Sequence, residues 1–238
     1  MTVGLDLAFA PGATLTVRHI GSEREPVLVV DGATGQVDAL RAFAADQADF
    51  ASATSVGSGY PGLLGTAPVA YVDAVVRAIL PLIATHFTGH PVRPARARGN
   101  FSLVTTAPAA LTADQRVPHV DTADRLQFAT VHFLSPGNGD GTAFFRHRAT
   151  GFETIDAARL PAYQAARADD PVPPPRYCLG MDDGFETIEI VPALPDRLLL
   201  YRAALLHSGW ITTLPAQPDD PRHGRLTGNL FLQCRVDA

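Results

Sequence analysis

RLTGNLFLQCR, residues 225–235, is the stretch of this sequence that decides the fold. Successive side chains of a β-strand point to opposite faces, so an extended stretch of this kind presents two separate sets of residues. One set is uniformly apolar and predicts packing against a core: Leu226, Leu230, Leu232 and Cys234. The other set begins with Arg225 and Thr227, which could form a fork for a carboxylate. A solvated strand face is the alternative interpretation of this second set.

Other short strand-like runs fill the sequence between residue 100 and the end of the chain. They are separated by Gly, Pro and Asn-Gly punctuation, notably SPGNGDG at 135–141. A proline-rich segment at 169–176 predicts an extended loop. The strand-like runs lie at 101–105, 126–134, 142–147, 185–191, 197–201 and 225–235. This half of the chain therefore predicts an antiparallel β structure that closes on itself.

The first 99 residues mix strands with helices. Strand patterns lie at 14–20 and 27–30, and a helical pattern lies at 36–47. The strongest helix is expected over 66–83, where Val69, Val72, Val76, Ile79 and Ile83 recur at helical spacing. We expect this helix to back a sheet. The prediction is one mainly β domain with flanking helices over 1–238, with support in 1–99 and most of a barrel in 100–238.

The composition excludes several functional classes. Of the 238 residues, 46% are hydrophobic, which is enough for a sizeable core, and the net charge of -5 argues against nucleic acid as the main partner. All 19 basic residues are arginine, so neither a Schiff-base lysine nor a phosphate-loop lysine is available. Two cysteines are too few for a disulfide framework.

The sequence also bears on location. The first ten residues lack the basic region of a signal peptide, and Asp6 interrupts their apolar run. The apolar stretch at 69–84 is interrupted by Asp73, Arg77 and Pro81, so no membrane span is expected. These features favour a cytoplasmic protein.

RVPHVDTADR, residues 116–125, carries the strongest chemical signal. In an extended segment His119 and Asp121 point to the same side and can lean onto one ion. A third ligand could come from His207, which ends the apolar run of Leu205 and Leu206. Two histidines and a carboxylate with open positions are typical of non-haem Fe(II) oxygenases, with zinc as the rival metal. Ordinary loop residues, and a buried histidine bonded to backbone, are the alternatives.

Three of these segments together resemble a known superfamily. PHVD at 118–121, LLHSGW at 205–210 and GRLTGNLF at 224–231 resemble, in order and context, the motifs of Fe(II)/2-oxoglutarate-dependent oxygenases. Residues 139–145, GDGTAFF, and residues 27–44 resemble segments of the prolyl-4-hydroxylase-like branch. Residues 141–153 are most similar to a group of bacterial proteins of unassigned substrate.

The resemblance implies a fold, cofactors and an activity. The fold is a double-stranded β-helix, a cupin-like jelly roll of about eight strands. Fe(II) would be held by His119, Asp121 and His207, and 2-oxoglutarate would place its distal carboxylate on Arg225 and Thr227. The activity is that of an O₂-dependent dioxygenase acting on a small molecule or on an amino-acid side chain, and the intact carboxylate favours hydroxylation. The 18-residue separation of His207 and Arg225 is longer than expected for compact members.

Two further residues are candidates for the same site. His132, on the run at 126–134, could line the pocket and bind the oxoacid, or it could be a core histidine. Arg146 or Arg148 is expected to meet an acidic group of the substrate near the barrel mouth, unless Glu153 pairs with Arg146. Two other functions stay open, a metal-dependent hydrolase or isomerase on a cupin barrel and a non-catalytic ligand-binding barrel. The sequence does not predict an oligomeric state.

Overall fold

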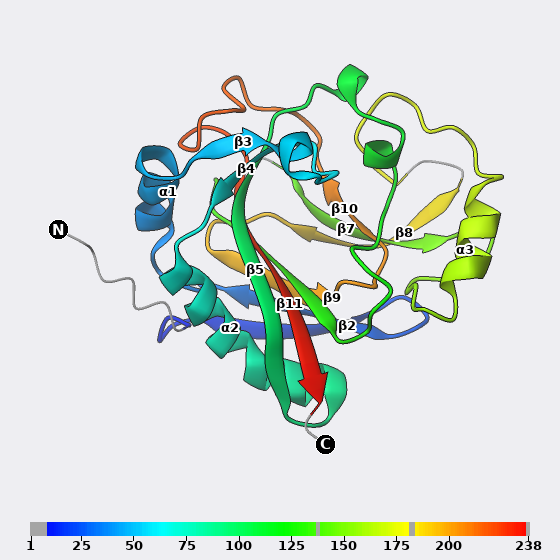
Figure 1. The fold of residues 1–238 in the computed structure, drawn as a ribbon, viewed down its shortest axis with the longest axis horizontal. Helices are drawn as coiled ribbons and strands as arrows, with labels where there is room; N and C mark the ends of the chain where they lie inside the picture. Colours follow the sequence, from blue (N-terminus) through cyan, green and yellow to red (C-terminus); the bar gives the residue numbers. More distant parts are fainter. Residues whose placement is uncertain (1–8, 137–138, 181–183, 237–238) are drawn as a thin grey trace.

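Two antiparallel β-sheets face one another in the computed structural model, which describes residues 9–136, 139–180 and 184–236 (Figure 1). The segment at 1–8 that bears on a leader peptide, and part of the turn at 135–141, lie outside the described residues. The large sheet has eight strands in the order β1-β2-β9-β6-β11-β5-β4-β3, and the small sheet has three in the order β10-β7-β8. All the pairings are antiparallel, as the sequence predicts.

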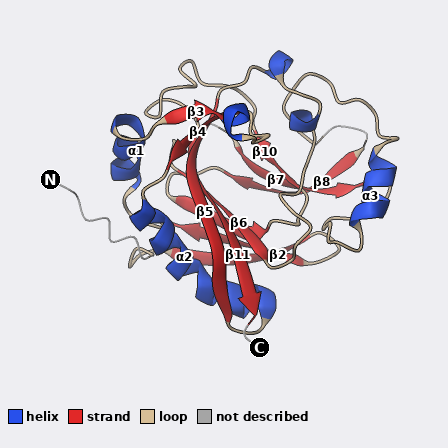
Figure 2. Ribbon diagram, viewed as in Figure 1, coloured by secondary structure: helices blue, strands red, loops and turns tan. Residues whose placement is uncertain are grey.

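Helices and strands are interspersed along the described part of the chain (Figure 2). The strands are β1 (Thr14–Ile20), β2 (Glu25–Asp31), β3 (Phe50–Ser52), β4 (Gly62–Thr66), β5 (Val92–Val104), β6 (Gln127–Phe133), β7 (Gly141–His147), β8 (Phe185–Pro192), β9 (Arg197–Arg202), β10 (His207–Trp210) and β11 (Leu226–Val236). The helices are α1 (Val37–Asp46), α2 (Val69–Ile83) and α3 (Leu160–Arg167), with short helical turns η1 (Ala53–Val56), η2 (Ala84–Thr88), η3 (Pro108–Ala110) and η4 (Asp114–Arg116).

The later part of the chain has the topology of a double-stranded β-helix. From β5 onward the chain passes back and forth between the large and small sheets, except that β7 and β8 follow each other within the small sheet. The segment at His119 joins the small sheet through a bridge to His207 of β10. The large sheet thus contributes β9-β6-β11-β5, and the small sheet contributes this segment and then β10-β7-β8. This arrangement confirms the predicted jelly-roll fold. β1 and β2 extend the large sheet on one side, and β4 and β3 extend it on the other, so the support segment and the barrel share one sheet.

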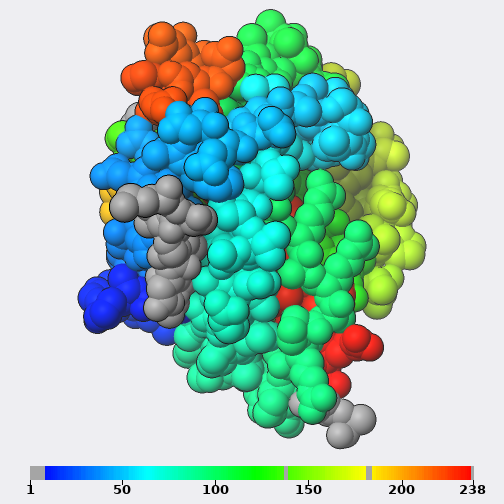
Figure 3. Space-filling view, turned by 60° about the vertical axis from the view of Figure 1, so that its left-hand side comes forward, coloured from blue at the N-terminus to red at the C-terminus, as the bar shows by residue number. Residues whose placement is uncertain are grey.

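Helices α1 and α2 cover the outer face of the large sheet. Figure 3 shows this face, with β11 visible in small patches behind the covering segments and, at its C-terminal end, at the lower right. The apolar set of the 225–235 stretch packs here, as its pattern predicts, together with buried residues of α2. The contributing side chains include Tyr71, Val75, Ile79, Ile83, Leu226, Leu230, Leu232 and Cys234. The opposite set of β11 therefore faces the space between the two sheets.

The helical stretch Val69–Thr88 is long and apolar enough to cross a membrane by length and composition alone. The stretch meets this criterion despite Asp73, Arg77 and Pro81, contrary to the expectation from the sequence. One face of α2 is buried against the sheet. A core helix passes the same test, so the finding is weak evidence for a membrane span.

Candidate metal centre

A cavity of about 720 Å³ opens between the two sheets. Its floor is the inner face of β5, β6 and β11, and its other wall comes from β10 and from the segment that precedes β6. Alternation along β11 turns its polar set, which begins at Arg225, into this cavity. Three residues from the two chemical motifs, His119, Asp121 and His207, line the same space.

The structure brings these three residues together. His119 Nε2 lies 3.8 Å from Asp121 Oδ1, and His207 Nε2 lies 3.6 Å from Asp121 Oδ2. All three ligand atoms lie within 4.8 Å of one another. Paired backbone hydrogen bonds between His119 and His207, each 2.9 Å, hold the two histidine segments side by side, and the N–H of Asp121 donates to Ala203. The short β-bridge therefore positions ligands that are 86 to 88 residues apart in the sequence.

Hydrogen bonding at His207 leaves one ring nitrogen, Nε2, available to a metal. His207 Nδ1 donates to the carbonyl of Leu205 at 2.8 Å, so its Nε2 carries the lone pair that faces Asp121. A backbone carbonyl in this position fixes the tautomer and the ring orientation that a metal ligand needs. Tyr201 packs its ring 4.9 Å from that of His207 and restrains it further.

The protonation states also suit a cation. Burial lowers the pKa of His207 to about 4. The exposed half of His119 faces the cavity, where enclosure by protein and the neighbouring His207 lower its pKa to about 4, with Asp121 opposing. Burial raises the pKa of Asp121 to about 6, although His119 lowers it. At neutral pH the three groups are therefore two neutral imidazoles and one carboxylate, which is the form that binds a metal.

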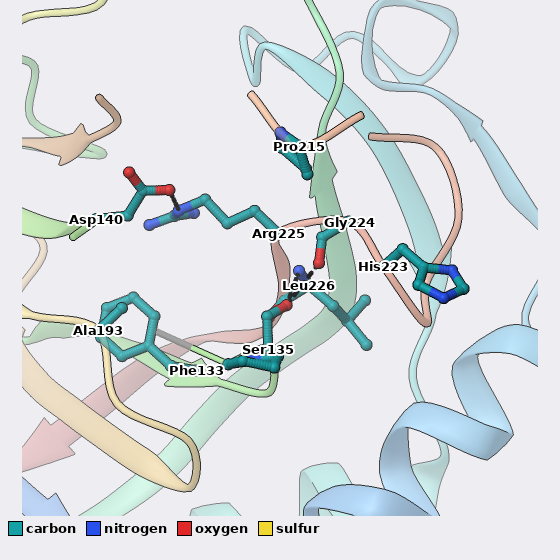
Figure 4. A pocket seen from close by; sticks show the side chains of 10 residues that line it. Phe133, Ser135, Asp140, Ala193, Pro215, His223, Gly224, Arg225 and Leu226 are labelled. Atoms are coloured by element: carbon teal, nitrogen blue, oxygen red, sulfur yellow. Dashed lines mark hydrogen bonds and ion pairs between the residues drawn. The ribbon is translucent and has the colours of Figure 1, made fainter. Parts of the chain in front are cut away.

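Arg225 and Thr227 lie at one end of the same cavity. Both are buried, at 8% and 1% exposure. The Arg225 side chain extends toward Asp140, and one of its Nη atoms donates to the carbonyl of Gly141 at 2.9 Å (Figure 4). Its Nε lies 3.6 Å from Asp140 Oδ2, and its guanidinium carbon lies 5.7 Å from the ring centre of Phe133. Arg225 forms part of the wall between the main cavity and a smaller one of about 230 Å³.

Several buried polar atoms around the main cavity have no hydrogen-bond partner among the described residues. They include Asp121 Oδ2, Arg225 Nε, the hydroxyl of Tyr60 and Asn229 Oδ1. Leaving such atoms without partners costs roughly 1–3 kcal/mol each. A cation at Asp121 and an anion between Arg225 and Tyr60 would satisfy most of them. The residues present therefore fit a metal ion together with a small acid.

His132 does not belong to this site, which corrects the expectation that it binds the oxoacid. Its Nε2 donates to Asp196 Oδ1 at 2.9 Å, and its Nδ1 accepts from the hydroxyl of Tyr71 on α2 at 3.1 Å. Alternate positions of β6 face opposite ways, and the cavity takes Ala129 and Val131 instead. His132 is thus a buried core histidine with both nitrogens satisfied.

Arg146 is also placed elsewhere. It pairs with Glu153, Nη2 to Oε1 at 2.5 Å, and with Glu186, Nη1 to Oε2 at 3.0 Å. Burial alone would raise the pKa of Glu153, but hydrogen bonds from the backbone of Ser22 and Glu23 and from Arg146 outweigh it and lower the pKa. The pair is structural, and the expectation that Arg146 meets an acidic substrate loses its basis. The turn at 21–24, far away in the sequence, completes this ion-pair cluster, because Ser22 and Glu23 bind the carboxylate of Glu153 and Ser22 also binds Arg146.

Two tyrosines, Tyr60 and Tyr177, also line the cavity. Tyr60 lies beside Arg225, and burial raises the pKa of its phenol, so it stays a hydrogen-bond donor. Tyr177, from the end of the proline-rich segment, donates to the carbonyl of Thr106 at 2.6 Å. Neither tyrosine lies on a periodic element, so no pattern in the sequence marks it as facing the cavity.

A family model matches residues 11–232, which is nearly the whole chain; it is described as a family of unknown function, DUF6445. The chain belongs to this family. The matched range of the DUF6445 chain spans all three candidate metal ligands as well as Arg225 and Thr227. No curated protein matches the sequence.

Solved structures similar to the DUF6445 chain include non-haem iron enzymes. One is the α-ketoglutarate-dependent epimerase SnoN from nogalamycin biosynthesis, at 15% identity and a TM-score of 0.47, covering 88% of this chain and 78% of that one. Another is HygX from Streptomyces hygroscopicus with nickel and 2-oxoglutarate bound, at 13% identity and a TM-score of 0.46, covering 89% and 83%. TM-scores below 0.5 mark only a distant likeness of fold.

Proposed function

We propose that this protein is a non-haem Fe(II)- and 2-oxoglutarate-dependent oxygenase. The observation that carries the proposal is the convergence of His119, Asp121 and His207 in a cavity that also contains Arg225 and Thr227. Two neutral imidazoles and one carboxylate leave open coordination positions on iron. A hydrolytic site has no need of a buried arginine at the end of the same cavity.

Each residue has a separate task in this proposal. His119, Asp121 and His207 hold the metal. Arg225 and Thr227 bind the distal carboxylate of 2-oxoglutarate through charge-assisted hydrogen bonds, and Tyr60 can donate a third. Ala129, Val131 and Phe231 line the cavity between the two ends and keep water from its floor.

The bound iron and 2-oxoglutarate would supply O₂-dependent oxidation of a substrate C–H bond, with release of CO₂ and succinate. We propose hydroxylation of a small molecule or an amino-acid side chain as the outcome, because Asp121 occupies the position that a halide would need. The GDGTAFF segment supports the further proposal of a prolyl-4-hydroxylase-like branch, since Gly141 begins β7 beside Arg225.

The test is an anaerobic titration of the protein with Fe(II), with and without 2-oxoglutarate. A weak visible charge-transfer band is expected only when both are present, since the oxoacid must chelate the metal. His207→Ala should abolish the band, whereas His90→Ala, at an exposed turn, should leave it unchanged. Zinc binding with no effect of 2-oxoglutarate would instead favour a cupin-type hydrolase.

A further inference from the structure

The metal cavity contains a second group of positive charges, far from Arg225. Arg96 and Arg98 lie on β5 and line the cavity, as do Asn100 and Ser102 on the same strand. These positions are two residues apart, so all four side chains share one face of β5. The intervening positions face α2, where Phe101 stacks on Tyr71.

The strand register places the two arginines at and beyond the level of the metal. Arg98 pairs with Phe231 of β11, which pairs with Ala129 of β6, which pairs in turn with Tyr201 of β9. Tyr201 is the residue that packs on His207. Arg98 therefore lies in the row of the metal ligands, and Arg96 lies one row further from Arg225.

The same register separates these charges from the 2-oxoglutarate end. Ser102 pairs with Thr227, four residues along β5 from Arg98. Four residues of strand span roughly 13 Å, which is too far for one five-carbon dicarboxylate to bridge with the metal in between. Arg96 and Arg98 are thus available to a second ligand.

Arg96 and Arg98 also differ from many arginines of this chain. Eight other arginines form short ion pairs with carboxylates, namely Arg18, Arg125, Arg146, Arg159, Arg167, Arg197, Arg202 and Arg222. Within the described residues, no ion pair involves Arg96 or Arg98. Asp114 is the acidic residue that lines the cavity apart from Asp121; it is exposed, as are Arg96 and Arg98, and forms no ion pair with either arginine in the described part of the chain. Two like charges on one strand face repel each other, and a bound anion would relieve this.

We propose that Arg96 and Arg98 bind an anionic group of the substrate, a carboxylate or a phosphate, on the side of the metal away from Arg225. Two guanidiniums on one strand face can each give a planar pair of N–H donors to such a group. This inference rests on the proposed function, because it assigns 2-oxoglutarate to the Arg225 end. It names the substrate class as a small anionic compound whose reacting carbon lies between the anion and the metal.

The experiment measures binding, not turnover. Protein loaded with Ni(II) and 2-oxoglutarate is titrated calorimetrically with matched probes, phenylacetate against phenylacetamide and phenyl phosphate against phenol. The anionic member of at least one pair should bind at least ten-fold more tightly than its neutral partner. In Arg96→Gln/Arg98→Gln this preference should disappear while the affinities for Ni(II) and 2-oxoglutarate stay unchanged. The control, Arg77→Gln/Arg235→Gln, removes the same charge from exposed positions and should keep the preference.

The outcomes separate this inference from the function on which it rests. Equal binding within both pairs, or no binding of any probe up to its solubility, overturns the inference and leaves an oxygenase standing if Ni(II) and 2-oxoglutarate still bind. Loss of 2-oxoglutarate binding in Arg96→Gln/Arg98→Gln also overturns it, because the oxoacid would then use these arginines. Failure of the wild-type protein to bind Ni(II) and 2-oxoglutarate contradicts the proposed function itself. The stronger of the two anionic probes shows whether the group is a carboxylate or a phosphate.

Discussion

At the scale of single residues, the candidate site depends on which atom each side chain presents. His207 has Nδ1 committed to a carbonyl and presents Nε2, whereas His132 has both nitrogens committed. Two buried histidines, one on each sheet, thus differ completely in chemical availability. Burial alone does not make a ligand; an unsatisfied lone pair facing a carboxylate does.

Arg225 allows the oxoacid site to be tested separately from the metal site. Arg225→Ala should weaken 2-oxoglutarate binding by roughly 10- to 100-fold, because a charge-assisted hydrogen bond contributes about 1.5–3 kcal/mol. Fe(II) affinity should remain nearly unchanged. Calorimetry with each ligand in turn measures both.

Removal of Arg225 also leaves Asp140 without its cation, so a milder variant is needed as well. Thr227→Val keeps the shape of the buried side chain and removes only the hydroxyl. It should weaken 2-oxoglutarate binding by roughly 2- to 10-fold. The control is Arg235→Ala, an exposed change on the same strand. Parallel loss of both ligands in Thr227→Val would count against an oxoacid role for this face of β11.

Asp196 makes stability depend on pH. Burial alone would raise the pKa of Asp196, but hydrogen bonds from His132, Thr34 and Gly35 outweigh it and lower the pKa to about 2. Because the folded pKa lies below the ordinary 3.8, its stabilisation is present above about pH 4 and is lost as the pH falls toward 2. Asp196→Asn should cost roughly 2 kcal/mol at pH 7 and about half as much at pH 3.

Urea unfolding of both proteins at pH 7, 4 and 3 measures this difference. Asparagine suits the position, since residue 196 has a left-handed φ of 61° that Asn tolerates well. A cost that stays constant across these pH values would show that the carboxylate charge is not what stabilises the fold.

The sequence predicted part of the site because some patterns specify a direction. An extended His-x-Asp pair points to one side, and an apolar set on β11 forces the Arg225 set inward. The two faces of β6 cannot be told apart in this way, since both are buried. The expectation that His132 faces the cavity was therefore wrong, and His132 lies on the face toward α2. The Arg146–Glu153 pair was the alternative that the sequence left open, whereas the further partners of Arg146 come from the turn at 21–24 and from β8, over separations that no local pattern reveals.

At the scale of elements, the fold rests on α2 and the sheet beneath it. Of the positions predicted from helical spacing, Val76, Ile79 and Ile83 are buried in the main core and Val72 is partly buried, whereas Val69 is exposed. Strand β5 was recognised only from residue 101 and begins at Val92. Its first half alternates arginine with alanine and glycine, so the usual contrast of polar and apolar residues is missing. The short strands β3, β4 and β10 were not predicted because runs of three to five residues show little periodicity.

Two valines of α2 give a matched test of this packing. Val75 is 2% exposed in the core, whereas Val69 is 75% exposed at the start of the helix. Val75→Ala should lower the free energy of unfolding by roughly 2 kcal/mol, from lost transfer energy and a small cavity. Val69→Ala removes the same atoms and should change it by less than about 0.5 kcal/mol. Denaturant unfolding of the two variants measures the difference, and equal costs would argue against docking of α2 on the sheet.

At the scale of the whole molecule, the candidate metal ligands connect segments that the chain keeps apart. His119 and Asp121 come from the connection after β5, and His207 begins β10. Ligands that bind only the folded protein stabilise it by mass action. At concentrations of 100 times the dissociation constant this amounts to about 2.7 kcal/mol.

Ni(II) with 2-oxoglutarate should therefore raise the melting temperature by roughly 5–10 °C in a chain of this size. Differential scanning calorimetry with each ligand alone and with both measures the shift. Asp121→Asn should reduce the shift from the metal, and Arg235→Ala should not. An equal shift in the Asp121→Asn protein would place the bound metal elsewhere.

The carboxylate of Glu153, fully buried, accepts hydrogen bonds from the backbone of Ser22 and of Glu23 as well as from Arg146. A chain begun at residue 32 would keep the three candidate metal ligands, Arg225, Thr227 and every strand of the β-helix, all of which lie from Val92 onward. It would also remove three of the five hydrogen bonds that Glu153 accepts and take Leu28 and Val30 out of the main core. We expect such a truncated chain to lack native β structure by circular dichroism. The smallest piece able to do the chemistry is thus shorter than the smallest piece able to fold.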